Sequence, residues 1–457
     1  MKPSMLYYST NRQAEPVRFR DALLKGQAPD RGLYMPQELP AFSAEELRQF
    51  ASMEYYEIAY AVAWKFLAGE IPAADLLAIV HEAYNFPVPL EQVCDEKYVM
   101  RLDQGPTASF KDFAARMIGR LMQYFLKQDN RKLLILTATS GDTGSAMANA
   151  FYKLDNINVV VLFPENEVTE RQRKQMTTLH ENIQILSLDG KFDDCQALVK
   201  RAFSDPDLAY ANLSSANSIN IGRLLPQIIY YVYAFARLCG KRGGAEIIFS
   251  VPSGNFGNVM GGLIAKAMGL PVKKFVVATN ANDEFPKFLA SGDYAKVVPS
   301  RDCISSAMNV GHPSNVARLI ALYGGQMDET GAISAPPDFE RMRRDIFSVS
   351  ISDDATKQTI KDAYHAHHLL LEPHGAVGWA GLATYFERFP EQSAPDQVCV
   401  CLETAHPAKF PQEIQHILEI DPELPPSLEG LEDRPEAFLS VPNDYEIFKQ
   451  YIMDNYQ

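Results

Sequence analysis

Three polar loops are the segments of this sequence whose residue types and spacing could carry chemistry. They are residues 140–145 (SGDTGS), 253–258 (SGNFGN) and 404–409 (TAHPAK), and each follows a run of apolar residues. Glycines let the backbone turn its N–H groups towards one point, and a helix that begins there adds the positive end of its dipole. The first two loops are therefore candidate anion-binding sites, although a tight strand-to-helix turn requires glycines in the same way.

Lys111 is the candidate nucleophile, since it stands at the start of an amphipathic segment, residues 111–127. The field at a helix N-terminus disfavours the charged form of a lysine and so favours a free amine. Most lysines are simply solvated, but a free amine beside two anion-binding loops matches what pyridoxal phosphate requires. Neither loop fits GxxxxGK[ST], and no GxGxxG motif follows the first strand, which argues against nucleotide ligands.

The elements that must position these loops are short apolar strands that alternate with helices. Strands are predicted at residues 132–137, 158–163, 183–188, 246–251, 274–279 and 397–402. Helices are predicted at residues 145–152, 168–179, 192–203, 219–238 and 258–268, and Ser43 is predicted to start a further helix. Such alternation indicates parallel sheets with helices on both faces, and ligands bind beyond the carboxyl ends of the strands. We therefore predict an α/β fold with parallel sheets in two lobes, after a mostly helical N-terminal domain.

The composition argues against several classes of protein. The 457 residues are 47% hydrophobic and carry a formal net charge of −14, which is typical of a globular chain and disfavours nucleic acid as the main partner. No apolar run is long enough to span a membrane, and we expect no secretory signal. Six scattered cysteines without a CxxC motif favour a reduced, cytoplasmic protein. The His365–His368 cluster lacks the i,i+4 spacing of a metal site, so no metal is expected.

Six ordered motifs resemble those of the threonine synthases of the bacterial and fungal long-chain type. They are GPTASFKD (105–112), ATSGDTG (138–144), SANSINIGRLLPQI (215–228), VPSGNFGN (251–258), EPHGAVG (372–378) and TAHPAKF (404–410). The resemblance covers nearly the whole chain. It implies the tryptophan-synthase-β-like fold (fold type II) and pyridoxal 5′-phosphate as cofactor. It also implies the last step of threonine biosynthesis, conversion of O-phospho-L-homoserine and water to L-threonine and phosphate.

The same resemblance assigns roles to residues of this chain. Lys111 would bind the cofactor covalently and act as the catalytic base, and Thr404 would hydrogen-bond the pyridine nitrogen. The residues expected to bind the cofactor phosphate are Gly254, Asn255, Phe256, Gly257 and Asn258. Those expected to receive the substrate carboxylate are Ser140, Gly141, Asp142 and Thr143. Those expected to hold the substrate phosphate are Asn217, Ser218 and Arg223, with Lys409 as a second cation.

Two residues depart from the pattern that the resemblance implies. Gln104 stands where many relatives have histidine, which puts an acid–base role at that position in doubt. Glu403 stands where glycine is more usual, and it either alters the loop near the pyridine edge or points into solvent. A phospho-lyase that gives a 2-keto acid is the alternative activity, because no motif shows how water reaches Cβ. A non-catalytic binding protein is a further alternative.

The predicted organisation has two main parts. Residues 1–92 form the N-terminal domain and residues 93–457 the catalytic region. The catalytic region is expected to contain a small lobe at about 105–215, a large lobe at about 216–420 and a C-terminal packing segment at 421–457. The protein is expected to be a monomer or a weak homodimer.

Overall fold

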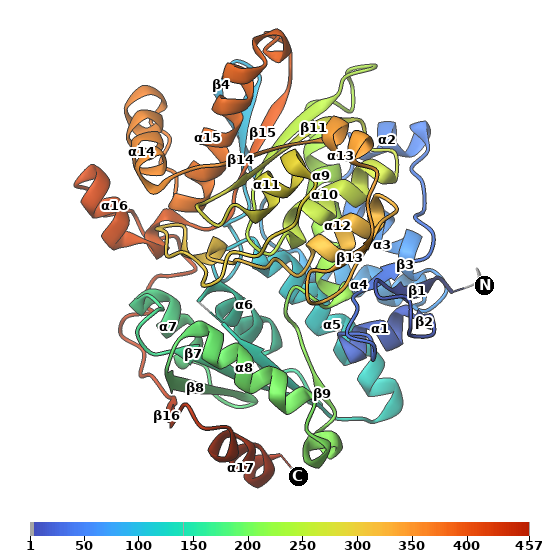
Figure 1. The fold of residues 1–457 in the computed structure, drawn as a ribbon, viewed down its shortest axis with the longest axis vertical. Helices are drawn as coiled ribbons and strands as arrows, with labels where there is room; N and C mark the ends of the chain where they lie inside the picture. The colour runs from blue at the N-terminus through green and yellow to red at the C-terminus, as the bar shows by residue number, and fades with distance from the viewer. Residues whose placement is uncertain (1–3, 140, 457) are drawn as a thin grey trace.

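The computed structural model describes residues 4–139 and 141–456 and has the α/β architecture predicted from the sequence. Figure 1 shows a larger lobe, a smaller lobe beneath it, and an N-terminal region (blue) that lies against the larger lobe. All six predicted strands are present with ends within two residues of the prediction. The helix that begins at Lys111 starts at the predicted residue. Strong local patterns therefore located these elements correctly, whereas the strands Leu90–Cys94, Lys97–Arg101 and Ile346–Ser350 were not predicted.

The N-terminal region combines four helices with a small antiparallel sheet of order β2-β1-β3. Its elements are β1 (Leu6–Ser9), β2 (Val17–Arg18), α1 (Phe19–Lys25), β3 (Tyr34–Pro36), α2 (Ala44–Phe50), α3 (Tyr55–Leu67) and α4 (Ala73–Ala83). Helix α2 begins as predicted, because Ser43 and Glu46 each accept a hydrogen bond from the other's backbone N–H. Helix α3 packs against α9 (Ile221–Leu238), so this region shares its core with the larger lobe.

The larger lobe is built on a six-stranded sheet of order β14-β11-β10-β15-β5-β4, parallel except for β4. The strands are β4 (Leu90–Cys94), β5 (Lys97–Arg101), β10 (Ile247–Pro252), β11 (Val272–Thr279), β14 (Ile346–Ser350) and β15 (Cys399–Glu403). On one face Phe249 packs with residues of α9 and α10 (Gly257–Ala267), and on the other Ile248 packs with α15 (Pro373–Arg388). Burial on both faces explains why these strands are continuous apolar runs.

The smaller lobe is built on a five-stranded parallel sheet of order β16-β8-β7-β6-β9. The strands are β6 (Leu133–Ala138), β7 (Ile157–Pro164), β8 (Ile183–Asp189), β9 (Leu213–Ser214) and β16 (Leu439–Pro442). Its helices are α6 (Asp142–Phe151), α7 (Glu170–Thr177), α8 (Phe192–Phe203) and the C-terminal α17 (Tyr445–Asn455). Helix α5 (Lys111–Asp129) contacts both α6 and α9 and so connects the two lobes.

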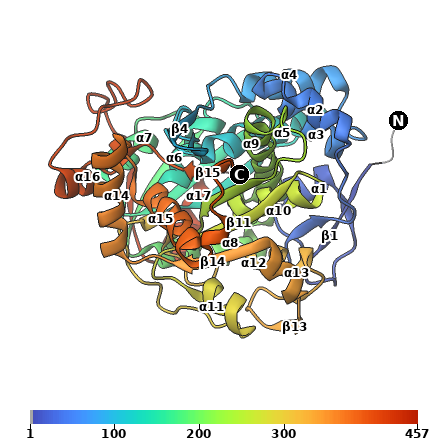
Figure 2. The ribbon, with the colours of Figure 1, turned by 90° about the horizontal axis from the view of Figure 1, so that it is seen from above.

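The remaining elements complete the two lobes and their edges. They are η1 (Pro206–Ala211), α11 (Glu284–Ser291), η2 (Ser306–Met308), α12 (Val316–Leu322), β12 (Gln326–Met327), β13 (Ile333–Ala335), α13 (Phe339–Asp345), α14 (Asp353–His367), η3 (Pro390–Gln392), η4 (Pro407–Lys409) and α16 (Pro411–Leu418). Figure 2 shows α14, α15 and α16 on the side of the molecule opposite the N-terminal region. Within the described residues, no helix has the length and apolar character needed to cross a membrane.

Candidate active site

A cavity of about 1000 Å³ lies between the two lobes and receives the predicted loops. Its lining includes twelve predicted site residues: Lys111, Asp142, Thr143, Asn217, Ser218, Arg223, Gly254, Asn255, Phe256, Gly257, Asn258 and Thr404. Gly141 and Lys409 are not among the described lining residues, and Ser140 lies outside the described part of the chain. The cavity sits beyond the carboxyl ends of β6, β10 and β15, where parallel sheets place their ligands.

Lys111 is the first residue of α5, and its side chain is almost completely enclosed at the cavity wall. Burial lowers the pKa of its ammonium group. Asp142 opposes this by stabilising the positive charge, whereas the nearby cations Lys409 and Arg223 lower the pKa further. The result is a lowered pKa with burial as the leading cause, so Lys111 gives up its proton more readily than a solvated lysine, which is the direction that the sequence predicted.

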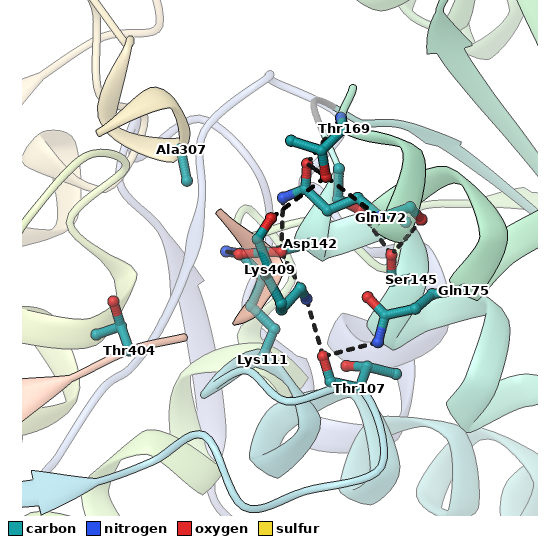
Figure 3. A network of polar contacts seen from close by, with 12 residues as sticks. Thr107, Lys111, Asp142, Ser145, Thr169, Gln172, Gln175, Ala307, Thr404 and Lys409 are labelled. Atoms are coloured by element: carbon teal, nitrogen blue, oxygen red, sulfur yellow. Dashed lines mark hydrogen bonds and ion pairs between the residues drawn. The ribbon is translucent and has the colours of Figure 1, made fainter. Parts of the chain in front are cut away.

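Asp142 is the centre of a buried network that sequence reasoning did not foresee (Figure 3). Its Oδ1 lies 2.7 Å from Nζ of Lys409 and accepts a hydrogen bond of 2.9 Å from Nε2 of Gln172. Its Oδ2 lies 3.5 Å from Nζ of Lys111. Although burial alone would raise the pKa of Asp142, Lys409 and Lys111 hold it well below its usual range. The side chain of Asp142 is thus an ionised partner of two lysines.

Lys409 therefore occupies a different place from the one expected of a second cation for the substrate phosphate. Its side chain is fully buried, and its ammonium donates to the backbone carbonyl of Thr107 at 2.8 Å in addition to pairing with Asp142. The ammonium group of Lys409 is therefore bound by groups of the protein itself. The geometry gives no support to direct contact between Lys409 and substrate.

The start of α6 offers fewer free N–H groups than the glycine pattern suggested. The hydroxyl of Thr139 accepts hydrogen bonds from the N–H groups of Gly141 at 3.0 Å and Gly144 at 2.8 Å. Gly141 has a φ of 130°, a backbone conformation that L side chains rarely adopt. The main chain at Thr143, which lines the cavity, remains a candidate to receive a carboxylate.

The loop before α10 has the form of an anion-binding site. Phe256 precedes the helix with a φ of 63°, and none of the described hydrogen bonds uses the N–H groups of residues 254–257. An added Cβ at Gly254 would lie 2.9 Å from the carbonyl oxygen of Ala307, so the loop requires glycine there. The hydroxyls of Tyr230 and Tyr231 both donate to Oδ1 of Asn258 at 2.6 Å. Nδ2 of Asn258 is buried without a partner.

Arg223 is a buried cation at the cavity wall. It belongs to the first turn of α9, is 4% exposed, and donates from Nη1 to the carbonyl oxygen of Ala216 at 3.0 Å. Among the described residues, its Nε has no hydrogen-bond partner and its guanidinium forms no ion pair with a carboxylate. Burial lowers the pKa of its guanidinium to about 10. An anion in the cavity would relieve this desolvation cost.

Thr404 lines the cavity and is backed by a buried carboxylate that no sequence signal assigned. Its hydroxyl donates to Oε1 of Glu372 at 3.3 Å, a long hydrogen bond. Glu372 also accepts hydrogen bonds from the N–H groups of His374 at 2.8 Å and Gly375 at 2.9 Å, and its Oε2 contacts Nδ1 of His374. Nε2 of His374 accepts from the N–H of Ala307 at 3.0 Å. These contacts fix the wall around Thr404.

The two departures from the motif pattern have clear positions. Glu403 is fully buried, so the expectation that it might point into solvent is wrong; its Oε1 accepts the N–H of Glu372 at 2.8 Å. Burial and then Glu372 raise its pKa well above the usual value. Gln104 donates to Asp103 at 2.9 Å and is not among the described lining residues. This position gives no support to an acid–base role for Gln104.

Comparisons with known proteins agree with this architecture. Residues 86–403 match the family described as "Pyridoxal-phosphate dependent enzyme". The chain belongs to this class of enzymes, and pyridoxal 5′-phosphate is its cofactor. Residues 6–84 match "Threonine synthase N terminus" and residues 376–452 match "Threonine synthase, C-terminal". Within the class, the chain is a member of the threonine synthase family.

Individual relatives support the same placement over the full length. The threonine synthase of Haemophilus influenzae is 38% identical, covering 98% of this chain and 100% of its own. That of Escherichia coli is 35% identical, covering 99% and 100%. Among solved structures, PLP-bound threonine synthase from Brucella melitensis has a TM-score of 0.91 at 36% identity, covering 99% of this chain and 100% of its own. Threonine synthase from yeast has a TM-score of 0.89 at 29% identity, covering 99% and 98%.

The residues present fit the cofactor. A lysine with a lowered pKa stands at the cavity wall, as covalent attachment of an aldehyde requires. The N–H groups of residues 254–257 and the unpartnered Nδ2 of Asn258 provide donors for a phosphate group.

Proposed function

We propose that the chain converts O-phospho-L-homoserine and water to L-threonine and phosphate. The single observation that carries the choice of substrate is Arg223, a buried guanidinium at the wall of the cavity that has no carboxylate partner in the described part of the chain. A planar guanidinium binds phosphate through two parallel hydrogen bonds. Asn217, whose Oδ1 is buried without a partner, and Ser218 lie beside it in the lining. A small amino-acid phosphate therefore suits this end of the cavity.

The cofactor, when bound, supplies the electron sink that weakens the bonds at the substrate's Cα. Lys111 attaches the cofactor and then, as a neutral amine, takes and returns protons at the carbon atoms of the substrate. Residues 254–258 would bind the cofactor phosphate, and Thr404 would hydrogen-bond the pyridine nitrogen. The main chain at Asp142 and Thr143 receives the substrate carboxylate.

A phospho-lyase that releases a 2-keto acid is not favoured. The full-length relatives are threonine synthases, and the N-terminal and C-terminal segments match families specific to them. A purified-protein assay with pyridoxal phosphate and O-phospho-L-homoserine separates the two activities. Equal amounts of phosphate and threonine are expected, whereas phosphate with 2-oxobutyrate would contradict the proposal.

Replacing Arg223 tests the substrate-phosphate site. Arg223→Met is expected to lower kcat/KM by roughly 10- to 100-fold, because charge-assisted hydrogen bonds to phosphate are lost. It should also raise the free energy of unfolding measured without substrate, since a buried and unpaired charge is removed. Steady-state kinetics and urea unfolding check the two effects. Unchanged kcat/KM would place the substrate phosphate elsewhere in the cavity.

We also propose a reducing, cytoplasmic location and a monomeric or weakly dimeric state. All six cysteines are free thiols, and Cys195, Cys239, Cys399 and Cys401 are buried. A protein that folds in an oxidising compartment would more often use cysteines as disulfides. Analytical ultracentrifugation over a range of concentrations measures the oligomeric state directly, and a stable tetramer would contradict this expectation.

A further inference from the structure

Two lysines share one buried carboxylate beside the cavity, and only one of them faces the cavity. Lys111 and Lys409 approach different oxygens of Asp142, at 3.5 Å and 2.7 Å respectively (Figure 3). Lys111 lines the cavity, whereas Lys409 is not among the described lining residues. The group therefore carries one negative and up to two positive charges with almost no access to solvent.

Lys409 is held in this place by several contacts. Besides Asp142, its ammonium bonds the carbonyl oxygen of Thr107, in the loop that precedes α5. The η4 turn that carries Lys409 is in turn fixed to the start of α7. There Nη1 of Arg171 donates to the carbonyl oxygen of Ala408 at 2.6 Å, and Thr169 donates to that of Lys409 at 3.4 Å. The charge of Lys409 is thus a fixed part of the protein.

We propose that Lys409 is a positioning residue that acts through Asp142 to keep the amine of Lys111 weakly basic. Asp142 stabilises a positive charge on Lys111, and Lys409, which lies closer to the same carboxylate, repels that charge and so offsets part of the stabilisation. Lys111 must be neutral to accept a proton from substrate, and this inference rests on that role in the proposed function. A lone Asp142 beside Lys111 would have the opposite effect and hold Lys111 in its charged form.

The surrounding charges are compatible with this role. The other cation that lowers the pKa of Lys111 is Arg223, which is fixed by its contact with Ala216. Asp112, on the same helix as Lys111, is buried and accepts hydrogen bonds from the N–H and hydroxyl of Thr107 at 2.8 and 2.7 Å. Among the described residues, Asp142 is the carboxylate that pairs with Lys111. Lys409, the other partner of Asp142, therefore influences how strongly Lys111 holds its proton.

The test is a pH titration of the holoenzyme without substrate. The visible absorbance of the cofactor bound to Lys111 depends on whether the Lys111 nitrogen carries a proton, so its midpoint measures the basicity of that nitrogen. Lys409→Met is expected to raise the midpoint by about one pH unit, a tenfold change in proton affinity, and Asp142→Asn to lower it by a similar amount. Lys409→Arg, which keeps the charge, should stay near the wild-type midpoint.

A matched control separates this effect from general changes of charge or stability. Lys174→Met removes a lysine that instead bonds the carbonyl oxygen of Glu432, away from the cavity lining, and should leave the midpoint unchanged. An unchanged midpoint in Lys409→Met, or shifts of equal sign in Lys409→Met and Asp142→Asn, would overturn the proposal. If Lys409→Met does not fold, Lys409→Gln takes its place, because it also removes the charge but keeps a polar group that can bond the carbonyl oxygen of Thr107. Because no substrate is present, a wrong substrate assignment would not change these outcomes.

Discussion

Burial and neighbouring charges set the pKa values of the ionisable side chains around the cavity. Arg223 and Glu403 are both almost inaccessible to solvent, and burial shifts their pKa values in opposite directions, downward for the guanidinium and upward for the carboxyl group. Asp142 behaves differently, because its two lysine partners outweigh the effect of burial. The charge of each group therefore follows from its neighbours and not from its residue type alone.

Glu403→Gln is expected to stabilise the protein increasingly as the pH rises above about 4.5. Burial and Glu372 raise the pKa of Glu403 in the folded state above the usual 4.5, so the folded protein keeps a proton that the unfolded chain releases. The free energy of unfolding therefore falls with pH by about 1.4 kcal/mol per unit until folded Glu403 ionises. Glutamine has the same shape and removes this dependence.

Urea unfolding at several pH values from about 4 to 8 measures this difference. Glu423→Gln, at an exposed glutamate, is the control and should show no such trend. A stability difference between Glu403→Gln and wild type that stays constant over this pH range would show that Glu403 ionises normally despite its burial.

The first turns of five helices position the side chains of this site. Helices α5, α6, α9, α10 and α15 all begin at or beside the cavity, with Lys111, Asp142, Arg223, Asn258 and His374 in their first turns. Such positions combine unpaired backbone N–H groups with a positive dipole end. The start of α15 is also tightly packed, because a Cβ added to Gly375 would overlap Oε2 of Glu403.

Gly375→Ala is expected to destabilise the wild-type protein by about 1–3 kcal/mol, because the added methyl group displaces the buried Glu403 side chain. In a Glu403→Ala background the same change should be neutral or stabilising by up to about 1 kcal/mol, since alanine is the better helix former. A double-mutant cycle measured by urea unfolding gives the coupling between the two positions. Additive effects would show that the overlap is relieved by other movements.

The chain returns at its C-terminus to complete the smaller lobe. Strand β16 pairs with β8, and α17 buries Tyr445, Phe448 and Ile452 in a core shared with α8 (Figure 1). Along the way Arg173 makes two hydrogen bonds with Glu436, at 2.9 and 3.0 Å, which tie the returning segment to α7. The stability of the smaller lobe, which carries Asp142, thus depends on residues near the C-terminus.

Phe448→Ala is expected to destabilise the protein by about 3–5 kcal/mol, because a fully buried aromatic side chain is lost from this core. Ile447→Ala is the matched control on the same helix: Ile447 is 49% exposed, so its loss should cost much less. Hydrogen exchange should show faster opening of β8 in Phe448→Ala than in Ile447→Ala. Equal exchange of β8 in the two variants would mean that α17 does not stabilise the sheet.

Local sequence patterns were enough to predict much of the fold, Lys111 and the glycine-rich loops, whereas the roles of individual residues came from the family resemblance. Buried parallel strands have short apolar runs as their sequence pattern. A glycine-rich turn followed by a helix indicates a possible anion-binding site without any long-range information. This is why the strands, the start of α5 at Lys111 and the loop before α10 were located correctly. The short edge strands β9 and β16 were missed because two to four residues carry no distinct pattern.

Only the tertiary structure decided which charges meet inside the protein. Lys409 and Asp142 lie in distant parts of the chain, and nothing in their local sequence shows that they form a buried ion pair. Glu403 likewise could have faced solvent, but its position at the end of a central strand places it against Glu372. Residue type and spacing set what a side chain can do. Burial and partners set its charge, because the energy of a charge depends on its whole surroundings.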